Sequence, residues 1–93
     1  MSTVQSAAIL RRKTVESLTG YSRSTIYLRI AQGLFPKPIS LGARAVGWPA
    51  VDVAALNAAR IAGKTDEQIR ALVLKVEAAR ISTGAGISTP AQE

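Results

Sequence analysis

The stretch Thr19–Pro38, TGYSRSTIYLRIAQGLFPKP, carries the start and stop signals of one short helix and the turns on either side of it. Gly20 suits the left-handed stop of a preceding helix, and Ser22 suits the N-cap of the next one. That second helix is predicted to run to about Gln32 and to end at Gly33, before the prolines of the Phe-Pro-Lys-Pro corner exclude helix. The link TGYS is as short as the turn of a helix-turn-helix.

The residues on both sides of this stretch extend the pattern. Upstream, AILRRK (8–13) is a short strand or an extended lead-in, and Thr14 is a plausible N-cap for a brief helix through Leu18. Downstream, PISLG and AVGW are two β-prone pieces around GAR, which predicts a hairpin with Gly42 near its tip. Pro49 then fits the first position of a third helix that runs to Gly63. Its core-like positions are Val53, Leu56 and Ala59.

A further helix is predicted after Lys64. Thr65 and Gln68 form a capping box at its start. Its apolar positions recur at helical spacing and are Ile69, Leu72, Val73, Val76 and Ala79. This stripe suits either dimerisation or folding back onto the small core, and the sequence does not choose between them.

Together these signals predict a mainly α fold with a small β-hairpin, namely a winged helix-turn-helix with an additional C-terminal helix. We expect a DNA-binding domain over residues 8–63, an amphipathic helix over 64–81 and a disordered tail over 82–93, whose composition is small and polar.

The composition argues against an enzyme. The 93 residues include no cysteine and no histidine, which removes disulfides, thiolate nucleophiles, Cys/His zinc sites and imidazole bases. The six carboxylates are scattered along the sequence, and GARAVG lacks the Gly-Lys-Ser/Thr of a phosphate loop. We therefore predict no catalytic residues, no metal and no cofactor.

The charge is distributed unevenly. Residues 1–63 hold eight basic and two acidic side chains, whereas residues 64–93 hold four of each, so the whole excess of +6 lies in the first part. A basic module joined to a neutral segment indicates a polyanionic partner for the module.

The helix Ser22–Gln32 has two different sides. Ile26 and Ile30 form an apolar stripe with Tyr27 on its flank. The other side carries short hydroxyls with arginines at its margins, which suits close approach to base edges and phosphates. With the basic residues of the hairpin, the candidate DNA-binding residues are Ser22, Arg23, Ser24, Thr25, Tyr27, Leu28, Arg29, Lys37 and Arg44.

Simpler interpretations stay open for several of these residues. A polar face with Arg and Ser is also normal on a solvated helix, and Arg11-Arg12-Lys13 is more often a solvated cluster than a phosphate contact. Tyr27 suits packing with its hydroxyl at the edge as well as it suits binding. Trp48 is better suited to anchoring the hairpin to the third helix than to stacking on a ligand.

The motifs resemble those of the AlpA family of small phage and prophage regulators, which is similar to excisionases and to MerR-type winged-helix domains. The resemblance covers roughly residues 9–62 and is carried by Leu18-Thr19-Gly20, Ser22–Tyr27, Phe35-Pro36, Leu41-Gly42 and Arg44–Trp48. It implies a DNA-binding winged helix-turn-helix with Arg23, Ser24, Thr25 and Tyr27 in the recognition helix and Arg44 in the wing. Tyr21 departs from the family's usual Leu, and the role of residues 64–81 cannot be transferred because the shortest members lack this length.

We therefore expect a sequence-specific binder of double-stranded DNA. The resemblance implies a transcriptional regulator or a recombination directionality (excision) factor of a prophage or integrative element, acting at promoter or attachment-site DNA, with an integrase as a candidate partner. Because so small a module buries little surface, we expect a homodimer or a cooperative oligomer on the DNA. The alternative is a basic protein-interaction adaptor without sequence-specific DNA binding.

The sequence also bears on location. No apolar run approaches the length of a membrane span, and the first residues, MSTVQSAAIL, lack the pattern of a signal peptide. We expect a cytoplasmic protein that is associated with the nucleoid when bound to DNA.

Overall fold

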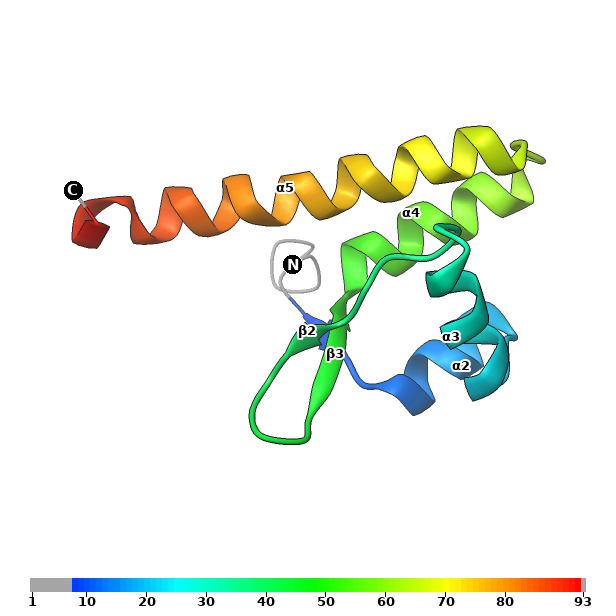
Figure 1. Cartoon of the computed structure of the whole chain (residues 1–93), viewed down its shortest axis with the longest axis horizontal. Helices are drawn as coiled ribbons and strands as arrows, with labels where there is room; N and C mark the ends of the chain where they lie inside the picture. The colour runs from blue at the N-terminus through cyan, green and yellow to red at the C-terminus, as the bar shows by residue number, and fades with distance from the viewer. Residues whose placement is uncertain (1–7, 93) are drawn as a thin grey trace.

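The computed structural model describes the backbone of residues 8–92 and the side chains of residues 8–80. In chain order the elements are β1 (Ile9–Leu10), α2 (Arg12–Thr19), α3 (Arg23–Ala31), β2 (Ile39–Ser40), β3 (Val46–Pro49), α4 (Ala50–Ile61) and α5 (Asp66–Gln92). The helices α2 and α3 form the helix-turn-helix, and β2, β3 and the loop 41–45 form the wing. The loop of the wing and the α2–α3 pair project on the side of the molecule away from α5 (Figure 1). The predicted fold, mainly α with a small hairpin and an added C-terminal helix, is confirmed.

The sheet has three antiparallel strands in the order β1-β3-β2. The lead-in residues 8–13 thus contribute a strand, in which Ile9 pairs with Pro49 and Leu10 with Trp48. A Cβ at Gly47 on the central strand would lie 2.7 Å from Ile9 Cγ2 and 3.0 Å from the Leu10 carbonyl oxygen. Glycine is therefore required at this position by the close approach of β1.

The turn between α2 and α3 follows the signals in the sequence. Gly20 has a φ of 78° at the C-cap of α2, and its N–H donates to the Glu16 carbonyl at 2.8 Å. Ser22 is the N-cap of α3, where its Oγ accepts a hydrogen bond from the Thr25 N–H at 3.2 Å. Both predicted boundaries are confirmed.

Two other predicted helix starts were wrong, one by three residues and the other by one. The first helix begins at Arg12 rather than after Thr14, because Arg11 is extended and Arg12 pairs with Glu16 one turn later, with 2.9 Å between Nε and Oε2. Pro49 is the N-cap of α4 and the last residue of β3 rather than the first helical residue, because its ψ of 135° keeps the chain extended.

All four aromatic residues of the chain lie in one cluster. Phe35 is in edge or tilted contact with Tyr21 and Trp48, with ring centroids 6.3 and 6.2 Å apart, and Tyr27 lies 6.5 Å from Trp48. Trp48 is completely buried, and its indole N–H donates to the Pro36 carbonyl at 2.8 Å. Trp48 is thus the anchor that the sequence suggested, and it joins the wing to α3 as well as to α4.

The remaining core is aliphatic. The buried hydrophobic residues besides Phe35 and Trp48 are Val15, Ile26, Leu34, Val53, Leu56, Ala59, Ile69 and Val73. The predicted core positions of α4 are therefore confirmed.

The helix α5 folds back along α4 and contributes Ile69 and Val73 to this core. The capping box at its start is confirmed by reciprocal bonds of 2.9 and 3.1 Å between Thr65 and Gln68. Of the predicted stripe, only Ala79 is exposed. Within the described part of the chain, no helix combines the length and the apolar character that a membrane span requires.

The helix α5 also extends further than the sequence indicated, since its backbone is helical to Gln92 rather than ending near residue 81. The tail expected over 82–93 is therefore helical up to Gln92, and Glu93 lies outside the described residues. Gly84 and Gly86 weaken a helix by about 1 kcal/mol each but keep its backbone hydrogen bonds.

Replacing Trp48 with Phe tests the anchor. The variant keeps an aromatic ring but leaves the buried Pro36 carbonyl without its donor, so we expect the free energy of unfolding to fall by about 1–3 kcal/mol. Urea unfolding followed by far-UV circular dichroism measures this change. Leu74→Ala, at a side chain that is 68% exposed, is the control and should change stability by less than about 0.5 kcal/mol. Equal losses in the two variants would contradict the role of Trp48.

Candidate nucleic-acid interface

The outer side of α3 is open to solvent. Ile26 is completely buried beneath it, whereas Arg23, Ser24 and Leu28 are exposed, Leu28 to 55%. Ser24 and Leu28 are one helical turn apart and therefore share a face. Thr25 is half-buried, and its hydroxyl accepts a hydrogen bond from Ser22 at 3.0 Å. The exposed face thus combines a small hydroxyl, an apolar side chain and an exposed guanidinium in the first turn.

Two predicted site residues are partly engaged in packing. Tyr27 is 40% exposed while its ring contacts Trp48, so it serves the core at one edge and remains accessible at the other. The guanidinium of Arg29 lies 5.6 Å from the centre of the Tyr21 ring, a cation–π contact, and its buried Nε has no hydrogen-bond partner among the described residues. Arg29 is therefore turned toward the α2–α3 link and is less free than Arg23.

The wing carries the predicted site residue Arg44 close to Arg11-Arg12-Lys13, the cluster for which the sequence favoured a solvated surface. Arg44 lies in the loop 41–45 and lines a hollow of about 220 Å³ together with Arg11, Arg12, Lys13 and Val46. We call these four basic residues the basic corner. Arg12 is paired with Glu16, which leaves three of the four cations without an acidic partner in the described structure.

The start of α2 adds to the positive potential of the basic corner. Arg11 is the N-cap of α2, and no side chain caps the first turn. Uncapped N–H groups and the helix dipole both favour an anion at this position. In the view of Figure 1 the start of α2 lies between the wing and α3. Together, four cations and a helix start form a surface suited to a phosphate group.

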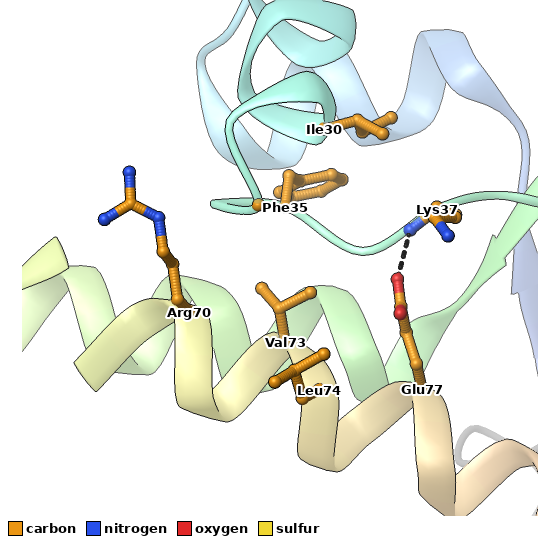
Figure 2. Close-up of a pocket in the computed structure, with 8 residues that line it drawn as sticks. Ile30, Phe35, Lys37, Arg70, Val73, Leu74 and Glu77 are labelled. Atoms are coloured by element: carbon orange, nitrogen blue, oxygen red, sulfur yellow. Dashed lines mark hydrogen bonds between the residues drawn. The ribbon is translucent and has the colours of Figure 1, made fainter. Parts of the chain in front are cut away.

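Lys37 lies elsewhere. It is exposed just before β2, and its backbone N–H donates to Glu77 Oε2 of α5 at 2.8 Å. It lines a different hollow from Arg44, between the end of α3 and α5 (Figure 2). The two basic residues that flank the hairpin in sequence are therefore not part of one cluster.

The sequence did not identify Arg11, Arg12 and Lys13 as candidate site residues. The residue that completes their cluster, Arg44, is distant in sequence. The available signal was the β-prone AILRRK segment next to them. Pairing of that strand with β3 is what carries the cluster to the base of the wing.

Comparisons with known proteins show the family of the chain. The family model described as "Prophage CP4-57 regulatory protein (AlpA)" matches residues 8–58, more than half of the chain. The chain is also 49% identical over 55 residues to a protein of Enterobacteria phage P4 named "Uncharacterized protein ORF88". That match covers 59% of this chain and 62% of the relative, so the chain spans less than two thirds of the relative's length. No solved structure matches the chain.

The family match includes β1, the helix-turn-helix, the wing and most of α4, and stops before α5. These are the elements that build the exposed face of α3 and the basic corner. The chain belongs to the AlpA family of phage regulatory proteins.

Proposed function

We propose that this protein is a non-enzymatic, sequence-specific binder of double-stranded DNA, which acts as a transcriptional regulator or as an excision factor of a prophage or integrative element. The observation that carries the proposal is the basic corner. Residues far apart in sequence place four cations around one hollow, at the start of α2 and on the loop of the wing.

Holding like charges together costs free energy unless an anion neutralises them. In the basic corner only Arg12 has an acidic partner within the described structure. A phosphate of the DNA backbone neutralises these cations. Because binding releases the counterions that were condensed on the DNA, the affinity depends on the salt concentration.

The exposed face of α3 supplies the sequence preference in this proposal. Short side chains such as Ser24 allow the helix to approach base edges closely, and Arg23 has the geometry to contact guanine or a phosphate. Leu28, which is 55% exposed, fits the methyl group of thymine. The wing positions Arg44 for a phosphate or for the minor groove.

The regulatory part of the proposal rests on the family, whose described member is a prophage regulatory protein. Binding at a promoter gives regulation, and binding at an attachment site gives an excision role together with an integrase. A homodimer or a cooperative oligomer on adjacent sites supplies the affinity that one small module lacks.

The direct test is a fluorescence anisotropy titration against duplexes from the neighbouring promoter and attachment regions, each with a scrambled control, at several salt concentrations. We expect tighter binding to one natural duplex than to its scrambled form at physiological salt. Binding that ignores sequence and disappears at this salt concentration would favour the protein-interaction adaptor instead.

Two alanine variants separate the roles of α3 and the wing. Arg23→Ala should lower discrimination between the preferred and scrambled duplexes by about 1–3 kcal/mol. Arg44→Ala should weaken binding to every duplex and reduce the slope of log K against log salt by about 1. Lys75→Ala, at an exposed position of α5, removes the same charge and should change neither quantity. The proposal fails if all three variants bind alike while folded.

The basic corner has a matched control elsewhere on the chain. The double variant Arg11→Ala/Lys13→Ala should lower the salt slope by about 2 and weaken binding without regard to sequence. The double variant Lys64→Ala/Lys75→Ala removes two cations from another hollow, on the α4–α5 side. If long-range charge alone attracts DNA, both double variants lose the same affinity, and that result would exclude a local phosphate site.

A further inference from the structure

The segment that joins α3 to the wing, residues 32–38, is held by α5 at both ends. At its start, Arg70 Nε donates to the Gln32 carbonyl, the C-cap of α3, at 2.9 Å. Near its end, Glu77 Oε2 accepts the Lys37 N–H at 2.8 Å, drawn as the dashed line in Figure 2. Figure 2 also shows that Arg70 and Glu77 project from α5 on either side of Val73 and Leu74.

Phe35 of this segment and Val73 of α5 belong to the same buried core, and the two hydrogen bonds add directional contacts beside this packing. Between them lies a hollow of about 240 Å³, lined by Ile30 and Phe35 on one side and by Val73 and Leu74 on the other. Because this hollow leaves part of the interface between the connection and α5 unfilled, the polar contacts at its margins help to fix the position of the connection relative to α5.

A third contact holds the other end of the wing. Arg80 Nε lies 2.7 Å from Asp52 Oδ2, and the two side chains are only 18% and 6% exposed. Asp52 is in the first turn of α4, which follows β3 directly. The helix α5 therefore holds the end of α3, the start of the wing and the element after it.

These three side chains share the side of α5 that faces the rest of the fold. Positions 70, 77 and 80 are separated by seven and three residues, spacings that place side chains on one face of a helix. The same side carries the core residues Ile69 and Val73. The family match stops at residue 58, so Arg70, Glu77 and Arg80 lie outside the matched module, although the residues that they contact lie within it.

We propose that Arg70 and Glu77 are positioning residues for DNA binding: through them α5 fixes the wing relative to α3, so that both engage one duplex, and neither residue contacts the DNA. The inference rests on the proposed function. The contacts of α3 and of the wing reinforce each other only when their spacing matches that of their sites on the DNA. If the connection between them were mobile, binding would also cost the conformational entropy of ordering it.

Glu77→Ala tests the proposal because charge and positioning predict opposite changes in DNA affinity. On charge alone, removing a carboxylate strengthens binding to a polyanion, whereas loss of positioning weakens it. We expect affinity for the preferred duplex to fall about tenfold with an unchanged salt slope, because no phosphate contact is lost. Glu77→Gln keeps an oxygen acceptor for the Lys37 N–H and should bind at least as tightly as the wild type. Glu67→Ala, an exposed carboxylate in the first turn of α5, is the matched control and should not lose affinity.

A double-mutant cycle separates positioning from a merely structural role. If Glu77 acts through the wing, Glu77→Ala should cost less than about twofold when Arg44→Ala has already removed the wing contact. Titrations are made well below the melting temperature of each variant, so that a loss of stability does not contribute. Full additivity of the two effects would overturn the inference.

Arg70→Ala serves as the second variant if Glu77→Ala does not fold. It breaks the bond to Gln32 and should weaken binding more than Lys75→Ala, which removes the same charge from the same helix. Equal binding by these two variants, or wild-type binding by Glu77→Ala, overturns the positioning role while the proposed function stands. A wild-type protein that does not distinguish the natural from the scrambled duplex overturns both.

Discussion

The rest of the structure depends on the burial of Trp48. Its ring is completely inaccessible on the central strand of a very small sheet, and its indole N–H is satisfied by the Pro36 carbonyl. Through Phe35 and Tyr27 it contacts both the connection after α3 and α3 itself. In a chain with so little core, one large side chain that touches α3, the connection and the wing determines how these parts are placed.

The sheet and the basic corner follow from this arrangement. Because β3 is the central strand, β1 pairs beside it, and Gly47 is required where the two backbones approach closely. The pairing brings Arg11–Lys13 to the base of the wing, next to Arg44. The concentration of positive charge on this surface is therefore a consequence of strand pairing as much as of composition.

The local features could be predicted from the sequence because their causes are local. The Ser22 cap, the Gly20 stop and the Thr65–Gln68 capping box each depend on residues within one helical turn, and the structure confirms all three. The contacts that build the site are different. Pairing of Ile9 with Pro49, or the hydrogen bond from the Lys37 N–H to Glu77, joins residues about 40 positions apart, and periodicity carries no information about such partners. For the same reason Lys37 and Arg44, the basic residues expected to flank the hairpin, lie in different hollows.

The central claim is that the exposed face of α3 and the basic corner contact one DNA duplex. A titration of the ¹⁵N-labelled protein with its preferred duplex, followed by amide chemical shifts, tests this claim directly. The account predicts the largest changes at Ser24, Thr25 and Leu28 and at residues 11–13 and 43–45, with little change at Ala71, Leu74 and Lys75 on the exposed side of α5. Changes confined to α5, or absent from α3, would contradict it.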